Sequence, residues 1–214
     1  TGFIAVLTDG EGCILNLFGG VPVVAAAQEM NMVPGAYMDE GSIGTNAMGT
    51  ALRENVPVQI TAKEHFITAY HCWTCSAAPI HDVSGKIVGV LNLTGNSELV
   101  HPHTLGLVVA AVQSIEYQLV GQHVEHELSE TSLALSSIVD NLSYGLISCD
   151  TDGKIQKINR AGARMLGLSH QEAEQQDKVG SLLPGWPSLI EVIAGGDKIL
   201  DEEVEFEAAQ GRER

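Results

Sequence analysis

The chain has 214 residues, of which 44% are hydrophobic, and its formal net charge at pH 7 is −16. This length allows one large domain or two small ones, each with its own core. The negative charge argues against direct contact with nucleic acid or an anionic membrane, because phosphate binding needs clustered Lys and Arg. No apolar run approaches the roughly 20 residues that span a bilayer, and four cysteines are too few for a disulfide framework. We therefore expect a soluble protein of the reducing cytoplasm.

Three segments share one pattern, in which an apolar run ends in Asp and a Gly three residues later precedes another alternating run. The segments are 3–18, 77–93 and 145–159, with Asp9, Asp82 and Asp150 before Gly12, Gly85 and Gly153. The Asp side chain can accept backbone N–H groups of a turn, and Gly supplies the positive φ that closes a hairpin with a bulge. The repeat predicts three antiparallel β-hairpins.

The segment between the first two hairpins changes its pattern several times. Residues 23–32 and 42–55 predict two short helices, 56–60 predict a strand, and 63–71 predict a short amphipathic helix. The order is therefore strand pair, two helices, strand, helix, strand pair. This order predicts an α+β domain in which helices lie on one face of an antiparallel sheet.

A nearly continuous helical pattern covers residues 102–141. Apolar residues recur at 3-4 spacing over 105–119, which fits packing on the same domain. They resume in a shifted frame at Leu128, Leu135, Ile138 and Leu142, which is typical of a seam that pairs two chains. We therefore expect a homodimer, a first domain over 1–120, a connecting helix over 121–142 and a second domain over 143–214.

The second domain begins with the hairpin 145–159 and a predicted helix over 160–168. Ser169 and Glu172 form a capping-box pattern that opens another helix. Residues 182–196 and 202–208 follow, and the latter are strand-like. One hairpin and one edge strand cannot cover that many helices, so we expect this domain to be incomplete at its C-terminus.

Cys72 and Cys75 form a CxxC pair with three histidines nearby, His65, His71 and His81. Residues 73–80 alternate like a strand, whereas the CxxC of a zinc site normally lies on a tight knuckle. A c-type haem needs His directly after the second Cys, and a thioredoxin-like pair follows a strand and opens a helix. Neither condition is met. We expect inert cysteines in a sheet, with no metal and no redox role.

Catalytic patterns are also missing from the sequence. Residues 44–50 have the glycine spacing of a P-loop but lack its Lys, and neither GxSxG nor HExxH occurs. We find no nucleophile–base pair, so we do not expect an enzyme.

Three segments carry a family resemblance: EGSIGTNAMGTAL (40–52), EHF (64–66) and WTCSAAPIHDVSGKIVGVLNLTG (73–95). They resemble the GAF domain of sigma-54-dependent transcriptional activators, in particular the acetoin and glycerol/dihydroxyacetone catabolism regulators. This resemblance covers roughly residues 1–120, and residues 131–208 resemble the front of a PAS domain.

The resemblance implies a sensory region that binds a small-molecule effector or a partner protein such as a metabolic enzyme, without a cofactor. The signal would pass through the dimeric helix and the PAS domain. An AAA+ ATPase that acts on sigma-54 RNA polymerase and a DNA-binding domain would belong to a longer protein, because this sequence contains neither.

In GAF domains the ligand pocket lies between the sheet and its covering helices. The resemblance therefore implies six ligand-binding candidates: Glu40, Thr45, Asn46, His65, Trp73 and Cys75. Each has a structural alternative. Glu40 and Asn46 could instead cap helices and pin the loop 35–44, and Trp73 and Cys75 are of residue types common in cores.

Two functions of other classes stay open. The same domain order could serve as the input module of a sensor histidine kinase, for which a helix bearing a phosphoacceptor His would have to follow. The GAF domain could also be a protein-interaction platform without a small ligand, which an empty pocket would favour.

Overall fold

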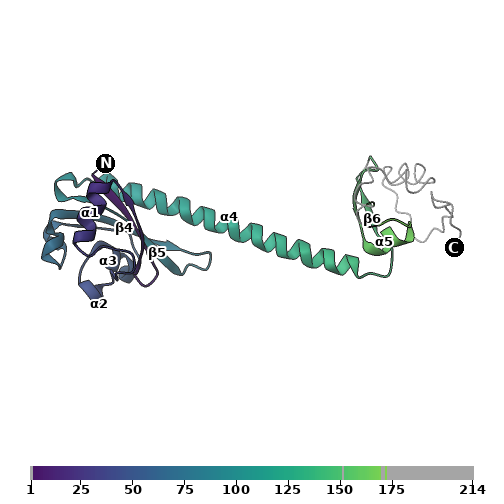
Figure 1. The fold of residues 1–214 in the computed structure, drawn as a ribbon, viewed down its shortest axis with the longest axis horizontal. Helices are drawn as coiled ribbons and strands as arrows, with labels where there is room; N and C mark the ends of the chain where they lie inside the picture. The colour runs from purple at the N-terminus through teal and green to yellow at the C-terminus, as the bar shows by residue number, and fades with distance from the viewer. Residues whose placement is uncertain (1, 151, 170–171, 173–214) are drawn as a thin grey trace. The chain divides into compact units, whose positions relative to one another are not determined.

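The computed structural model describes residues 2–150, 152–169 and 172. The chain divides into two compact units, Thr1–His126 and Glu127–Arg214. The first unit contains a five-stranded sheet, and the described part of the second contains a two-stranded one (Figure 1).

The five-stranded sheet is antiparallel throughout and has the order β2-β1-β5-β4-β3. Its strands are β1 (Phe3–Asp9), β2 (Ile14–Gly19), β3 (Val58–Thr61), β4 (Trp73–His81) and β5 (Ile87–Asn96). β1 pairs with β5 along its whole length, so the hairpins β1–β2 and β4–β5 lie side by side in one sheet.

All three predicted hairpins are confirmed, and their turns have the same geometry. Oδ1 of Asp9 accepts the backbone N–H groups of Glu11 and Cys13, each at 2.9 Å. Asp82 and Asp150 accept the same two N–H groups of their own turns, two and four residues further on. The glycines of the three turns have φ values between 75° and 86°, a region that residues with a Cβ rarely adopt. Each hairpin also carries the expected bulge beside its turn.

Three helices connect β2 to β3 and cover one face of the sheet: α1 (Val21–Glu29), α2 (Glu40–Ile43) and α3 (Ala47–Glu54). The predicted helix 23–32 is thus confirmed as α1. The prediction of one helix over 42–55 is wrong in its first part, because the chain leaves α2 at Gly44, where φ is 71°. It begins α3 only after Asn46, which is extended and caps that helix.

The prediction of a helix over 63–71 is also wrong. The segment forms two short 3₁₀ turns, η1 (Ala62–Glu64) and η2 (Thr68–Cys72), with extended backbone at His65 and Ile67. A capping box between Thr61 and Glu64 closes the first turn. Its local hydrogen bonds, together with the β-branched Ile67 and Thr68, favour this path over a continuous helix.

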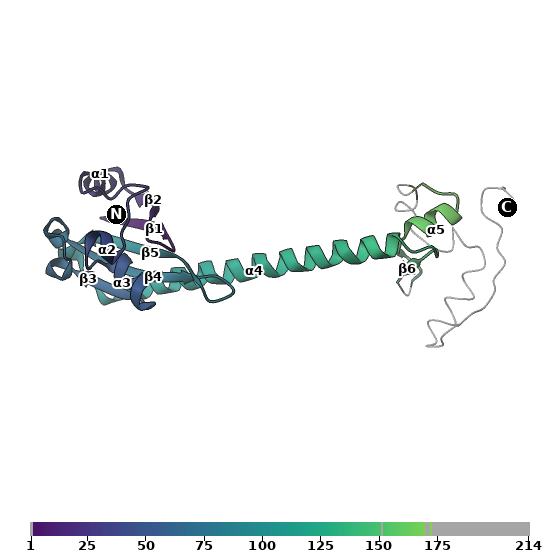
Figure 2. The ribbon, with the colours of Figure 1, turned by 90° about the horizontal axis from the view of Figure 1, so that it is seen from below.

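The predicted long helix is confirmed as α4 (Pro102–Asp140), after a short turn η3 (Ser97–Leu99). Val108 and Val112 of α4 are buried against Ala78 and Ile80 of β4, on the sheet face opposite to α1 and α3 (Figure 2). The α+β class is therefore confirmed, with α4 as an addition on the second face.

The length and apolar composition of α4 are relevant to the expectation that no segment spans a membrane. Among the described residues α4 is the one helix long and apolar enough to cross a membrane, by length and composition only. The sequence expectation concerned uninterrupted apolar runs, and polar residues such as Gln113, Ser114 and Glu116 interrupt this helix. Because helices of soluble proteins pass the same test, the finding is weak evidence for a span.

The described part of the second unit contains β6 (Ile147–Cys149), β7 (Ile155–Ile158) and α5 (Arg160–Met165). The predicted capping box is confirmed: Ser169 N–H donates to Glu172 Oε2 at 2.9 Å, and Glu172 N–H donates to Ser169 Oγ at 3.3 Å. The segments 182–196 and 202–208 lie outside the described residues.

Candidate functional site

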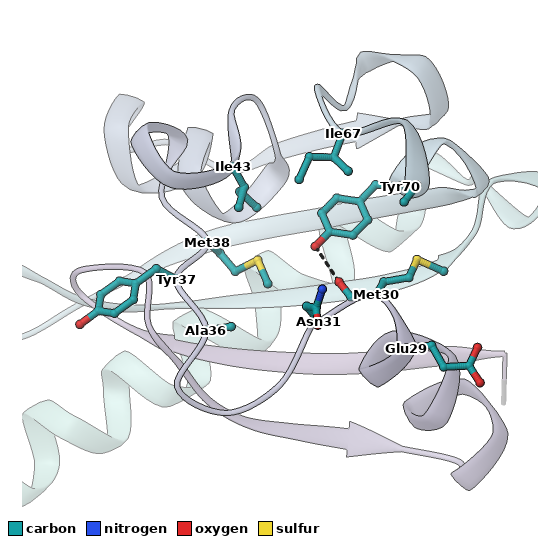
Figure 3. Close-up of a pocket in the computed structure, with 10 residues that line it drawn as sticks. Glu29, Met30, Asn31, Ala36, Tyr37, Met38, Ile43, Ile67 and Tyr70 are labelled. Atoms are coloured by element: carbon teal, nitrogen blue, oxygen red, sulfur yellow. Dashed lines mark hydrogen bonds between the residues drawn. The ribbon is translucent and has the colours of Figure 1, made fainter.

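A pocket of about 390 Å³ opens on the side of the sheet that α1, α2 and α3 cover (Figure 3). Its walls come from the end of α1, the loop that follows, α2 and η2. The lining residues are Glu29, Met30, Asn31, Ala36, Tyr37, Met38, Ile43, Ile67, Ala69 and Tyr70. Figure 3 shows Met38, Ile43, Ile67 and Tyr70 pointing toward one another, so the interior is mainly apolar with one phenol.

Tyr70 supplies the buried polar group of this pocket. Its hydroxyl donates to the carbonyl oxygen of Met30 at 3.3 Å, the dashed line of Figure 3. Burial raises the pKa of Tyr70, so the phenol stays neutral at physiological pH. A neutral hydroxyl that makes one long hydrogen bond can also accept one from a bound molecule.

His65 lies beside Tyr70, with the two rings edge to face and their centroids 6.1 Å apart. Its side chain is buried, and Nδ1 is 3.0 Å from the carbonyl oxygen of Ala62. Burial lowers the pKa of His65, which favours the neutral ring. Nε2 has no hydrogen-bond partner in the part of the chain that the structure describes.

Trp73 and Cys75 lie side by side with Ala77 on the core face of β4, as the strand alternation predicts. The Cys75 thiol is 3.2 Å from Thr94 Oγ1, and burial raises its pKa to about 12. A thiol in this state is neither a nucleophile nor a metal ligand near neutral pH. Cys72 is exposed. Within residues 2–150, 152–169 and 172, no three His, Cys, Asp or Glu side chains are arranged to hold a metal ion.

Glu40 joins α2 to α3. Its carboxylate accepts hydrogen bonds from Thr50 Oγ1 at 2.6 Å and from Arg53 Nη1 at 3.0 Å. The hydrogen bond from Thr50 lowers the pKa of Glu40, and the hydrogen bond and positive charge of Arg53 lower it further. Both carboxylate oxygens therefore already have donors from α3.

Asn46 is fully engaged with the backbone. Oδ1 caps α3 by accepting the N–H of Gly49 at 3.0 Å, and Nδ2 donates to the carbonyls of Met38 and Gly44, each at 2.9 Å. Its neighbour Thr45 is exposed, and the Thr45 carbonyl accepts the N–H of Phe66. These contacts favour the structural alternative for Asn46 and Glu40.

None of the six candidates from the sequence lines this pocket. His65 touches it indirectly through Tyr70, and Trp73 and Cys75 belong to the core beneath the helices. Sequence reasoning missed Met30, Ile43, Ile67 and Tyr70. Tyr70 offered the one usable signal, since an aromatic ring with a polar tip often lines a binding site.

Comparison with known proteins places this geometry in a family. A model of the GAF domain matches residues 3–119, and a model of the PAS domain matches residues 134–205. The chain is 38% identical over 206 residues to a signal-transduction and transcriptional-control protein of Clostridium beijerinckii, covering 96% of this chain and 32% of that protein.

Two further relatives carry operon names. The acetoin dehydrogenase operon transcriptional activator AcoR of Bacillus subtilis is 40% identical over 125 residues, covering 58% of this chain and 21% of AcoR. The PTS-dependent dihydroxyacetone kinase operon regulatory protein of Escherichia coli is 27% identical over 162 residues, covering 76% of this chain and 25% of that protein. The chain thus spans about a third or less of these relatives, which are named as regulators and not as enzymes.

A solved structure has the same fold. It is the crystal structure of the Escherichia coli DhaR(N)–DhaL complex, with a TM-score of 0.86 and 26% sequence identity. The similarity covers 97% of this chain and 71% of that one. The chain therefore belongs to the GAF-domain family, continues into a PAS domain, and has regulators of acetoin and dihydroxyacetone operons among its homologues.

Proposed function

We propose that this chain is the sensory region of a sigma-54-dependent transcriptional activator and that the pocket beside Tyr70 binds its effector. The observation that carries the proposal is a pocket of about 390 Å³ with apolar walls and a buried phenol, on the helix-covered side of a GAF domain. The full-length protein would be cytoplasmic. Its AAA+ ATPase and DNA-binding domains would contact sigma-54 RNA polymerase and DNA, and the PAS domain would relay the signal to them.

The effector that suits this pocket is small and uncharged. Among the ten lining residues, Glu29 carries the charge and none is Lys or Arg. A phosphate or carboxylate would lose its hydration there without gaining a cationic partner, which is unfavourable. Neutral hydroxyketones fit better, and the operon names of two relatives include acetoin and dihydroxyacetone.

The proposal includes a homodimer through the second part of α4. Leu128, Leu135 and Ile138 are 65%, 58% and 62% exposed, and they follow a heptad spacing. Pairing with a second copy would bury these large apolar side chains and so stabilise a dimer. A dimer of parallel helices would carry a change in the GAF domain toward the PAS domain.

A second candidate is recognition of a partner protein instead of a small molecule. It draws support from the similar solved structure, which is a complex of DhaR(N) with DhaL. The sensor-kinase alternative has no comparable support, because the relatives are named as transcriptional regulators.

Fluorescence of Trp73 tests the small-molecule proposal. Trp73 is 7% exposed in the core under the pocket side, and the other tryptophan, Trp186, can be replaced by Phe. We expect acetoin and dihydroxyacetone to change the emission saturably in the Trp186→Phe protein. Their charged counterparts lactate and dihydroxyacetone phosphate should not. If all four compounds leave the emission unchanged, the partner-protein candidate is favoured.

A further inference from the structure

The turn that carries His65 holds this residue in one position. The Ala62 carbonyl accepts both the backbone N–H of His65 at 3.1 Å and the ring Nδ1 at 3.0 Å. Ala62 itself has φ of 50°, a strained value for a residue with a Cβ. On the other side, His71 Nε2 lies 3.1 Å from the His65 carbonyl. Strain of this kind persists where surrounding contacts over-determine it, often beside a functional site.

The contacts of His65 also determine its tautomer. A carbonyl oxygen can only accept, so Nδ1 must carry the hydrogen that points at Ala62. The ring is neutral because it is buried, and Nε2 is therefore a bare acceptor. His65 is 2% exposed and its Nε2 is buried, so bulk water does not satisfy this atom. A buried acceptor without a donor costs free energy, which a bound molecule can recover.

A second bare acceptor lies on the same side of the sheet. Asn92 is fully buried, its Nδ2 donates to Thr94 Oγ1 at 2.7 Å, and its Oδ1 has no partner among the described residues. It pairs with Val6 on β1 and Ala77 on β4, and both of these neighbours belong to the core beneath the helices. Among the described residues, the side of the sheet beneath α1 and α3 thus holds two buried acceptors without donors.

We infer that His65 Nε2 accepts a hydrogen bond from a hydroxyl group of the effector and so selects molecules that bring an O–H donor. This inference rests on the proposed function of the pocket beside Tyr70. Tyr70 lines the pocket and packs edge to face on the His65 ring, so the inference requires Tyr70 to turn aside when a hydroxyl group of the effector binds at Nε2. A carbonyl compound of the same size would leave Nε2 unpaired, and sites built on a buried polar partner reject analogues that lack it.

Three compounds with one carbon skeleton test the inference: acetoin, butane-2,3-diol and butane-2,3-dione. The first two have O–H donors and the dione has none. Isothermal titration calorimetry with the full chain should show that acetoin and butane-2,3-diol bind at least tenfold more tightly than the dione. His65→Phe should abolish this difference, and His65→Gln, which restores a side-chain acceptor, should keep part of it. His103→Phe, at an exposed histidine outside the site, should behave as the wild type.

The outcomes separate this inference from the proposed function. Equal affinity for the dione and the two donors overturns the role of His65 but leaves a small-molecule pocket. No binding of any of the three overturns both. Independently of any ligand, ¹⁵N NMR of the histidine rings should show His65 protonated at Nδ1, and protonation at Nε2 would overturn the inference directly.

Discussion

Asn46 and His65 are both buried polar side chains in the first unit, and their hydrogen bonds distinguish their roles. Asn46 uses its oxygen and both amide hydrogens on the backbone of residues 38–49. Asn159 repeats this arrangement in the second unit, where it caps α5 and donates to the carbonyls of Val139 and Tyr144. His65, in contrast, leaves Nε2 without a partner in the described part of the chain. A saturated side chain stabilises the fold, whereas one with a free acceptor is available to a ligand.

Replacing Asn46 should therefore affect stability more than binding. Asn46→Ala removes the cap of α3 and leaves two carbonyls without their donor. We expect the free energy of unfolding to fall by about 2–3 kcal/mol in urea titrations, from roughly 1 kcal/mol for the cap and a similar amount or more for the buried carbonyls. Thr45→Ala, at the exposed neighbour, is the control and should change it by less than about 0.5 kcal/mol. Unchanged stability together with weaker acetoin binding would instead assign Asn46 to the ligand.

His65 should make the stability depend on pH. Its pKa in the folded state is lowered by burial, so the unfolded chain binds the proton first as the pH falls. The contribution of His65 to stability is then fully present at pH values above about 6.5, the pKa of His in an unfolded chain. It decreases at lower pH, by at most about 1.4 kcal/mol per pH unit. Urea unfolding at pH 7.5 and 5.5 should show a smaller decrease for His65→Phe than for the wild type. An equal decrease in both proteins would mean that other groups cause it, and His103→Phe should match the wild type.

At the scale of elements, α4 has two distinct parts. Its first part is held to the sheet by the buried side chains of Val108 and Val112. Glu116 adds a polar contact, because its Oε1 accepts the backbone N–H of His81 at 2.8 Å and lies 2.8 Å from the ring Nδ1 of the same residue. The ring Nε2 of His81 lies 2.7 Å from Asn55 Oδ1 at the end of α3. His81 therefore contacts helices on both faces of the sheet, a direct link between the pocket side and α4. The part of α4 from Glu127 onward exposes Leu128, Leu135 and Ile138.

The exposed apolar row of α4 predicts a dimer that charges should disrupt. Leu135→Asp combined with Ile138→Asp would place unpaired charges in the seam, so we expect a monomer in multi-angle light scattering. Leu133→Asp is a matched control, because Leu133 is 68% exposed on the same helix but lies outside the heptad row. A double variant that keeps the mass of the wild type would mean that the interface lies elsewhere.

Across the whole molecule, the elements predicted from the sequence are those with local signals. The hairpins depend on Asp and Gly at fixed spacing, and α4 depends on a long apolar period, so both were predictable. The break before α3 was not, because it depends on Asn46 contacting the distant carbonyl of Met38. The pocket was missed for the same reason, because Met30, Ile43 and Tyr70 come from separate segments that only the tertiary fold brings together.

The central prediction is that this GAF pocket binds a small uncharged effector. Native mass spectrometry of the purified chain with added acetoin tests it most directly. Ala36→Leu fills part of the pocket with a side chain, and Ala25→Leu makes the same change at an exposed position of α1. We predict one bound acetoin per chain for the wild type and for Ala25→Leu, and none for Ala36→Leu. No bound acetoin on the wild type, or equal occupancy in all three proteins, would contradict the claim.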